Sequence, residues 1–346
     1  MRLRLPALAG LAFAALLLAP AAGAAHDPDW EGWFFQLDAA MLTPGNTNTP
    51  LIATAPSAFN GGSVRSNVEY MDWDDDLAFR LGFGYSFGSG GTLRVSYWSY
   101  DSDEDNDGSL YAYYTGPEYV WWTVGPATNI GYTYSYETAW KFDQEIEATT
   151  IDLEYLKTNQ ATDSLSVTYG VGLRAASFEE ELKGGYTVDP NGSAFRFPAM
   201  RTVDSDGFGF TGSVGVNYDF TDIVGIGSNL RVGFLTADVE ADHQVTDLDF
   251  YYLYASYPTS PDSITESSEA KDEVAMTLDF DLNLVLHTGP YIDVEVGFFY
   301  SRWTDLPEFN LTRTNNSIFS SAPSIMGEDR DHLSWSGAQV KLRFHI

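Results

Sequence analysis

The sequence predicts an all-β protein, a transmembrane antiparallel up-and-down β-barrel with short periplasmic turns and long extracellular loops. Three observations predict this fold. The chain opens with a secretory leader, long segments then alternate apolar and polar residues with period two, and the connections between these segments alternate between short and long. An outer-membrane barrel has these properties because it is exported, turns an apolar face to lipid and keeps its short turns on one side.

The leader is a predicted signal peptide over residues 1–25. It begins with the basic segment Met1–Arg4, continues through an apolar run to Pro20 and ends in the small residues Ala22–Ala25. This order matches the charged region, the apolar region and the cleavage site of a secretory signal, so we expect one mature barrel domain over 26–346. No later apolar run approaches the ~20 residues that a spanning helix needs, so a passage through the membrane must use strands.

Composition excludes several classes of protein. The chain has no cysteine, which excludes a disulfide scaffold and a lipid-anchored lipoprotein. Its formal net charge of −31 argues against nucleic acid and anionic lipid as partners. Aromatic residues make up 15% of the chain, although the mean hydropathy is only −0.19. A barrel that is apolar outside and polar inside accounts for both values.

Alternation identifies the strands in order along the chain. From Leu77 to Phe87 every second residue is a large apolar one, and Arg80 lies on the opposite face. The same reading gives strands at Trp33–Leu42, Leu77–Phe87, Thr92–Tyr100, Ile146–Lys157, Leu165–Phe178, Gly207–Phe220, Asn229–Ala237, Val274–Leu286, Tyr291–Trp303 and Leu333–Ile346. Most exceed the ~5–6 residues of ordinary strands, which favours a membrane barrel over the alternative, a soluble secreted β-sandwich.

Connection lengths support the same topology. Short links lie at Gly88–Gly91, Asn159–Asp163, Thr221–Ser228 and His287–Pro290, and long segments separate the remaining strands. This alternation predicts about ten strands, with both termini on the side of the short turns. The aromatic segments Tyr111–Trp122 and Gln244–Tyr257 could each contain a further hairpin, so twelve strands is the alternative.

Charged residues on the polar face of the strands are the candidate pore-lining residues. If the apolar faces meet lipid, these charges point into the lumen, where they must face water or one another. They are Arg80, Arg94, Asp152, Glu154, Arg174, Arg231, Asp279, Asp281, Asp293, Glu295, Lys341 and Arg343. Opposed charges could select solutes in an open passage, or salt-bridged ladders could fill a narrow barrel. On the closing strand, Lys341 and Arg343 are expected beside Gln36 and Asp38 of the first strand.

Several segments resemble a known family, the Legionella major outer-membrane-protein-like family of pore-forming proteins. The resemblance spans nearly the whole mature chain and is carried by Phe79–Phe87, Leu93–Trp98, Ile151–Tyr155, Tyr169–Ala175 and Val296–Trp303. It implies a porin-like activity in the outer membrane of a Gram-negative-type bacterium, without indicating a particular solute. We therefore expect a narrow, charge-lined passage for small solutes or ions. The alternative is a non-conducting structural or surface-adhesion barrel.

An acidic motif is the one candidate for a metal site. Residues 101–108 contain D-x-D-x-D-G, in which Asp103, Asp105 and Asp107 could hold a weak surface calcium ion. The position of the bidentate glutamate of a full calcium loop is occupied by Tyr114, which excludes an EF-hand. No other cofactor is expected.

The sequence does not favour an enzyme. An outer-membrane hydrolase needs a histidine beside an acid or a serine at the barrel rim, as could occur at Asp331, His332 and Ser334 or at Asp242 and His243. Neighbours on one strand point in opposite directions, so this spacing does not make a dyad. The expected partners are outer-membrane lipid, small solutes or ions, the barrel-insertion machinery acting through the C-terminal strand and, as an open possibility, further copies in a homo-oligomer. The final residue, Ile346, stands where such strands usually end in an aromatic.

Overall fold

The computed structural model describes residues 31–45, 50–56, 67–70, 73–111, 118–122, 131–132, 137–189, 195–247, 262–289, 291–304 and 332–346. The regular elements in these ranges are all β-strands. No helix in the described part of the chain is long and apolar enough to span a membrane. The predicted signal peptide at 1–25 lies outside the described residues.

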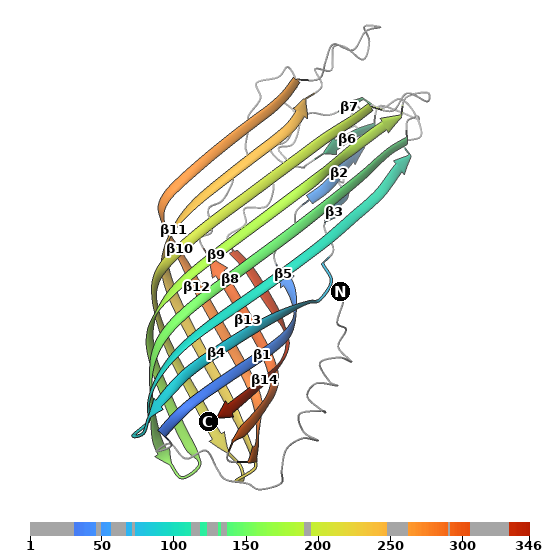
Figure 1. The fold of residues 1–346 in the computed structure, drawn as a ribbon. Coiled ribbons are helices and arrows are strands. Elements are labelled where there is room, and N and C mark those ends of the chain that lie inside the picture. Colours follow the sequence, from blue (N-terminus) through green and yellow to red (C-terminus); the bar gives the residue numbers. More distant parts are fainter. Residues whose placement is uncertain are drawn as a thin grey trace.

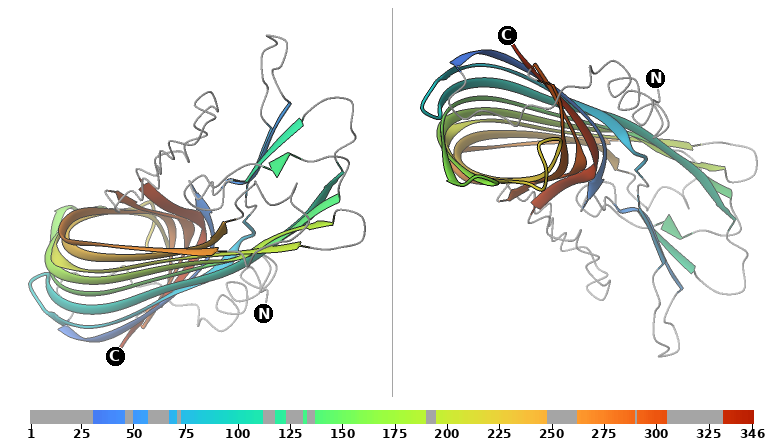
Figure 2. Two further views of the ribbon diagram at one scale, coloured as in Figure 1. Left: turned by 90° about the horizontal axis from the view of Figure 1, so that it is seen from above. Right: turned by 90° about the horizontal axis from the view of Figure 1, so that it is seen from below.

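Ten strands close into an antiparallel barrel (Figures 1 and 2). In chain order they are β1 (Glu31–Gly45), β4 (Asp76–Phe87), β5 (Gly91–Tyr111), β8 (Glu137–Thr162), β9 (Leu165–Asp189), β10 (Phe195–Asp219), β11 (Val224–Asp247), β12 (Asp262–Gly289), β13 (Ile292–Thr304) and β14 (His332–His345). Each strand pairs with the next, and β1 closes the ring by pairing with both β4 and β14. The predicted up-and-down barrel is confirmed, with ten strands rather than twelve.

Tight turns join strands at one end of the barrel, the short-turn end. Between β4 and β5, Gly88, Ser89 and Gly90 have φ angles of 68°, 50° and 76°. This left-handed conformation suits glycine, which has no Cβ, and it lets the chain reverse within a few residues. In the pairings of β1, Glu31 lies opposite Phe87 and Phe34 lies opposite His345. Both ends of the barrel sequence therefore lie at the short-turn end, as predicted.

The seam between β1 and β14 has the register that alternation predicts. Gln36 lies opposite Arg343, and Asp38 lies opposite Lys341. A slip of β14 by one residue would turn Lys341 and Arg343 from the lumen to the outer wall, because side chains alternate faces along a strand. The last residue contributes to the closure, since the backbone N–H of Ile346 donates to the carbonyl oxygen of Trp33 over 2.8 Å.

Six strands continue well beyond the other four. β5, β8, β9, β10, β11 and β12 rise past the ends of β1, β4, β13 and β14 as an open sheet, which we call the extension (Figure 1). The sequence-based strand bounds are corrected here: β8, predicted over Ile146–Lys157, has 26 residues. Much of the predicted loops Asp101–Glu145, Glu179–Asp206 and Asp238–Glu273 is strand.

A reversal of the apolar face explains why these strands look shorter in the sequence. In the lower part of β8, Ile151 and Leu153 point outward and are exposed. In the extension the outward residues include Glu145, whereas the inward Phe142 and Ile146 are fully buried. The strand continues while its apolar residues change sides, because its outer neighbour changes from lipid to water. The break in alternation near Ile146 therefore marks a change of the apolar face and not the end of the strand.

Four short strands form a second sheet that is separate from the barrel. They are β2 (Pro50–Pro56), β3 (Asn67–Tyr70), β6 (Glu118–Trp122) and β7 (Gly131–Tyr132), in the order β3-β2-β6-β7. β6 ends one of the two segments in which an additional barrel hairpin was considered, but it pairs with β2 and β7. In the other segment, residues 248–257 lie outside the described ones.

An apolar belt covers the outer wall of the barrel. Its side chains are strongly exposed, to 71% at Phe210 and 66% at Val171. Members on other strands include Phe83, Val95, Ile151, Phe234, Leu284 and Phe298. A continuous surface of this kind is costly in water and favourable in lipid, so the belt marks the membrane-spanning part of the barrel.

We predict that Gly337→Ala weakens closure of the barrel. A Cβ at Gly337 on β14 would overlap the carbonyl oxygen of Met41 on β1, so the two strands would have to separate locally. We expect a loss of about 1–3 kcal/mol in the free energy of unfolding, measured by urea unfolding in lipid vesicles. Gly212→Ala is the matched control, because a Cβ there meets no atom within 4 Å. Equal stability of the two variants would contradict the described seam.

Candidate functional site

The barrel interior is the candidate site, because the predicted pore-lining charges meet there. The structure places all twelve on inward-facing positions of the strands. Most are buried. Of the members that form ion pairs, Arg343 is the most exposed, with 32% of its side-chain surface accessible. Charges from strands distant in the sequence thus converge in one place.

Six of these charges form the ion-pair layer across the middle of the lumen. Arg174 Nε contacts Asp152 Oδ1 at 2.6 Å, and Arg174 Nη2 contacts Asp279 Oδ2 at 2.7 Å. Arg94 Nη2 contacts Glu154 Oε2 at 2.6 Å. The members of the layer are Arg94, Asp152, Glu154, Arg174, Arg231 and Asp279. They come from β5, β8, β9, β11 and β12, so the layer links strands on different sides of the barrel.

The arginines of this layer share their carboxylates. Arg231 Nε contacts Glu154 Oε1 at 2.8 Å, and its Nη1 lies 3.4 Å from Asp152 and 3.6 Å from Asp279. Arg174 also contacts two carboxylates, and each of the three carboxylates contacts two arginines. The arginine's planar fork of N–H donors suits this shared geometry. Removal of one partner would leave an uncompensated charge in the interior.

Glycines in the neighbouring strands make room for these large side chains. A Cβ at Gly172 would lie 2.8 Å from Cγ of Glu154, and a Cβ at Gly233 would lie 2.5 Å from Oγ1 of Thr277, which accepts a hydrogen bond from Arg174. The glycine-rich strands that the sequence shows therefore have a packing role, because two bulky inward residues cannot occupy adjacent positions in a narrow barrel.

A second group of charges lies along the seam. Lys341 Nζ contacts Asp281 and lies 3.7 Å from Glu295, which is 3.9 Å from Arg343. On the first strands, Arg80 lies 3.7 Å from Asp38, and Asp38 accepts hydrogen bonds of 2.8 and 2.9 Å from Gln36 Nε2. The seam thus contributes charges to the lumen, as its alternation predicts.

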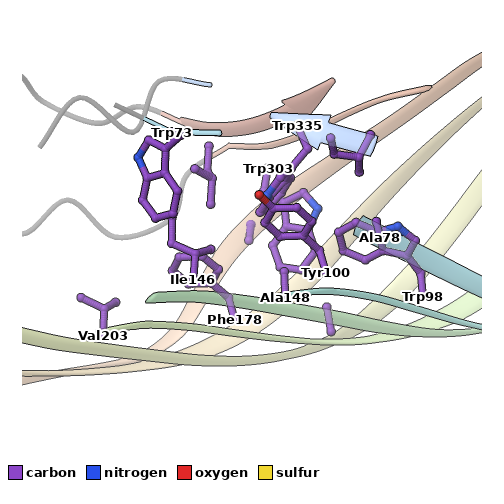
Figure 3. Close-up of a cluster of buried hydrophobic side chains, with 14 of the residues drawn as sticks. Trp73, Ala78, Trp98, Tyr100, Ile146, Ala148, Phe178, Val203, Trp303 and Trp335 are labelled. Carbon is purple, nitrogen blue, oxygen red and sulfur yellow. The ribbon is translucent and has the colours of Figure 1, made fainter. Parts of the chain in front are cut away.

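An aromatic layer lies next to the charges, toward the extension (Figure 3). Its members are Trp98, Tyr100, Phe299, Trp303 and Trp335. The ring of Trp335 lies 5.5 Å from that of Trp303 and 5.8 Å from that of Trp98, both nearly edge to face. The Arg80 guanidinium lies over the ring of Phe299 at 5.3 Å, which joins this layer to the charges.

The aromatic layer is not among the predictions from the sequence, although the sequence contains a signal for it. Trp98 lies an even number of positions from Arg94, and Trp335 an even number from Lys341. Residues that share parity on one strand share a face, so these indoles had to point inward with the charges. The predicted lumen contains charged side chains alone, so these two indoles are not part of it.

The two layers close the described lumen. Arg174, Asp152 and Glu154 are 1% exposed, Arg231 is 2% exposed and Trp335 is fully buried. A channel wide enough for water would expose the side chains that line it. In the described conformation the ion-pair and aromatic layers therefore leave no water-filled path between the side chains of the strands.

A small pocket lies between the two layers. Its wall includes Asp38, Arg80, Trp98 and Phe299. Nearby, Arg80 Nε, Gln36 Oε1 and Ser96 Oγ are buried without a hydrogen-bond partner. Unpaired buried polar atoms beside a small space are the usual setting of an internal water molecule.

Comparison with known proteins identifies the family. The family model described as "Legionella pneumophila major outer membrane protein precursor" matches residues 28–346. The chain belongs to this family. The protein is therefore an outer-membrane protein, as its apolar belt and barrel topology also indicate. Among curated proteins, none matches the chain significantly.

Several solved outer-membrane proteins are similar to the chain at low identity. The outer membrane protease OmpT of Escherichia coli is 11% identical, with a TM-score of 0.46 over 93% of this chain and 99% of the protease. The toluene transporter TodX of Pseudomonas putida is 7% identical, with a TM-score of 0.31 over 96% and 97% of the two chains. A Pseudomonas aeruginosa FadL homologue is 7% identical, with a TM-score of 0.28 over 95% and 96%.

The acidic motif of this Legionella-type outer-membrane protein lies on a strand. Asp103, Asp105 and Asp107 are on the outer face of β5, not in a loop. Alternate residues of a strand are about 7 Å apart, so these carboxylates do not converge as in a calcium loop. Within the described part of the chain, the acidic residues whose carboxylate oxygens lie close enough to share a metal ion are Asp101, Glu145 and Glu147. All three are exposed.

Asp101 and Glu147 belong to a row of acidic residues that crosses the strands on the outer face of the extension. The pairings place six carboxylates directly beside one another on six adjacent strands, namely Asp101, Glu147, Glu179, Asp204, Glu240 and Glu269. Like charges in this arrangement repel. Partial burial, followed by neighbouring carboxylates, raises the pKa of Asp101, Glu179 and Asp204 above its ordinary value.

The histidines considered for hydrolysis cannot be placed in the same way. The side chains of His243 and His332, and all of Asp331, lie outside the described ones.

We predict that Arg174→Met lowers the free energy of unfolding by about 3–5 kcal/mol. The substitution removes one of the buried arginines that neutralise Asp152 and Asp279. Adding Asp152→Leu should recover part of this loss. The measurement is urea unfolding in lipid vesicles. Lys141→Met is the control and should change stability by no more than about 0.5 kcal/mol, because Lys141 and Asp143 form an exposed pair on the extension. Unchanged stability of Arg174→Met would contradict the buried ion-pair layer.

We also predict that the extension becomes more stable as the pH falls from about 7 to about 5. A carboxyl group with a raised pKa in the folded state binds protons more readily than in the unfolded state, so its repulsion is relieved as the pH falls. Amide hydrogen exchange, corrected for intrinsic rates, should slow in the extension. Glu179→Gln should increase protection at pH 7 and reduce its dependence on pH. Faster corrected exchange at pH 5 would contradict this expectation.

Proposed function

We propose that this outer-membrane protein is porin-like, with a narrow passage for small ions or solutes that is closed in the described conformation. In this proposal it opens when residues of the ion-pair layer exchange partners. The observation that supports the proposal is the sharing of carboxylates: Arg231 lies within 4 Å of Glu154, Asp152 and Asp279.

Shared partners reduce the cost of opening. An arginine bound to a single buried carboxylate must lose its only neutralising charge before it can move, and this is strongly unfavourable. In the ion-pair layer, Arg174 can leave Asp152 while it remains bound to Asp279. A temporary path can therefore form beside the layer without leaving a bare charge in the barrel. The pocket beside Arg80 would hold water next to this path.

The charges of the lumen suggest what the passage transmits. Among the twelve predicted pore-lining residues together with Asp38, the cationic groups are Arg80, Arg94, Arg174, Arg231, Lys341 and Arg343, and the anionic groups are Asp38, Asp152, Glu154, Asp279, Asp281, Asp293 and Glu295. These sets nearly cancel, so we expect weak selection by charge, with a slight preference for cations. The aromatic layer adds a second constriction, which favours small species. The proposal assigns no catalytic step and no cofactor to the barrel.

The second candidate is a non-conducting structural or surface barrel. The observation that favours it is the near-complete burial of the ion-pair layer, where Arg174 and Glu154 are 1% exposed. If the layer never opens, it serves to fill and stiffen the barrel. The two candidates differ in one measurable property, which is conduction.

The test is single-channel recording on the refolded protein in planar bilayers. The porin-like function predicts small, brief current steps with weak cation preference. Arg94→Glu should shift selectivity further towards cations, because Arg94 lies in the ion-pair layer with a side chain 15% exposed. Lys141→Glu makes the same charge change on the outer face of the extension and should leave selectivity unchanged. Circular dichroism and heat-dependent gel mobility would verify that each variant folds.

Absence of current steps at every voltage in the folded wild-type protein would overturn the porin-like function and favour the structural barrel. If current appears but Arg94→Glu and Lys141→Glu behave alike, the ions pass elsewhere than through the ion-pair layer.

A further inference from the structure

Four titratable side chains meet inside the barrel at the short-turn end, where the chain closes. They are Asp219 at the end of β10, His287 on β12, Asp293 on β13 and His345 on β14. His287, Asp293 and His345 are buried, with 5–8% of their surface exposed, and the Asp219 side chain is 28% exposed. They stand apart from the ion-pair and aromatic layers, and of the four only Asp293 is among the predicted pore-lining residues.

The contacts form one continuous chain across four strands. His287 Nδ1 lies 2.8 Å from Asp293 Oδ1, and His287 Nε2 lies 3.2 Å from Asp219 Oδ1. The other oxygen of Asp293 lies 2.9 Å from His345 Nε2. Asp293 therefore joins two imidazoles, and His287 joins two carboxylates.

This geometry specifies the protonation of His287. An ionised carboxylate only accepts hydrogen bonds, so each ring nitrogen that faces one must carry a hydrogen. His287 faces a carboxylate on both sides and meets this condition only as an imidazolium. His345 faces Asp293 through Nε2, which must therefore carry a hydrogen. One proton on His287 thus completes the chain of contacts.

The backbone beside this cluster closes the barrel. The N–H of His287 donates to the carbonyl oxygen of Ile223 in the β10–β11 turn, at 2.9 Å. The N–H of His345 donates to Tyr291 in the β12–β13 turn, at 2.8 Å, and the next residue, Ile346, bonds to Trp33 at the start of β1. The cluster lies where two turns and both ends of the barrel sequence come together.

The described cationic groups nearest to this cluster have ion-pair partners of their own. On β14, Arg343 lies opposite Asp293 in the pairing, but its ion pair is with Glu295 at 3.9 Å. Lys341, further along β14, contacts Asp281 and Glu295. The β10–β11 turn carries a further acid, Asp222, whereas β11 presents Gly225 and Gly227 beside β12, and β1 presents Phe34 opposite His345.

We propose that Asp219, His287, Asp293 and His345 form a proton-operated lock that holds the closing strand β14 at the short-turn mouth. When His287 releases its proton to bulk water, it can donate to only one carboxylate. Its other nitrogen then presents a lone pair to a carboxylate oxygen, which is repulsive. The tie between β10, β12 and β13 is broken at one point, and β14, which bonds to Asp293 and to the β12–β13 turn, is held less firmly.

This inference does not rest on conduction, because the lock concerns the stability of the seam whether or not the lumen opens. It predicts that alkaline conditions loosen the short-turn mouth while the carboxylates stay ionised. The relevant range is between about pH 6 and pH 9, where a histidine can lose its proton and carboxylates do not titrate.

The experiment is hydrogen exchange, read by mass spectrometry, on the full folded protein in lipid at several pH values from pH 6 to pH 9. After correction for the intrinsic pH dependence of exchange, peptides from β14 and the β12–β13 turn should exchange about tenfold faster at pH 9, as expected on losing one charge-assisted hydrogen bond. The β4–β5 turn at Gly88–Gly91, which bonds to β8 and contains no histidine, is the internal control and should not change.

Two variants make the test specific. His287→Gln cannot become charged, so the change at pH 9 should disappear and exchange at pH 6 should already be fast. Asp219→Asn keeps the contact of His287 with Asp293 but removes one charged acceptor. The midpoint of the pH-dependent loosening should therefore lie at a lower pH than in the wild type. If His287→Gln fails to fold, Asp219→Asn still decides. Equal corrected rates at pH 6 and pH 9 in the wild type, or an unchanged midpoint in Asp219→Asn, would overturn the lock.

Discussion

An ionised side chain inside a membrane barrel requires an opposite charge, and much of this structure follows from that requirement. Arg174 and Arg231 are almost fully buried, and each is neutralised by carboxylates that other strands supply. Gly172 leaves space for Glu154, and Gly233 leaves space for Thr277, which accepts a hydrogen bond from Arg174. The resulting layer ties β8, β9, β11 and β12 together, and it also closes the lumen. The stability of the barrel and the closure of its described lumen therefore depend on the same six side chains.

The second constraint is that the outer neighbour of a strand changes at the membrane surface. Within the apolar belt, Ile151 faces lipid and Asp152 faces the lumen. Further along the same strand Ile146 faces inward, and the outward positions are acidic. This reversal produces an extension with an apolar inner face and a row of carboxylates outside. The extension carries its own electrostatic cost, because six like charges lie side by side across its outer face.

The closing seam shows how far local pattern can be carried. The inward direction of Lys341 and Arg343 and their position beside Asp38 and Gln36 were predictable, because parity along a strand fixes its faces and the two chain ends must meet. The inward direction of Trp98 and Trp335 follows from the same parity, although the predicted lumen contains charged side chains alone. The lock at His287 was not predictable from parity, because it depends on which turns approach one another.

The sequence by itself determined the order of the ten strands, the lipid-facing side of each in the belt and the set of charges in the lumen. These features have period two and are therefore local. Only the tertiary structure decided that Arg174 meets Asp279, 105 residues away, and that Asp103, Asp105 and Asp107 lie on a strand. It also decided where the strands end and that the described lumen is closed. Such features depend on the closure and register of the whole barrel, and no segment of the chain specifies these alone.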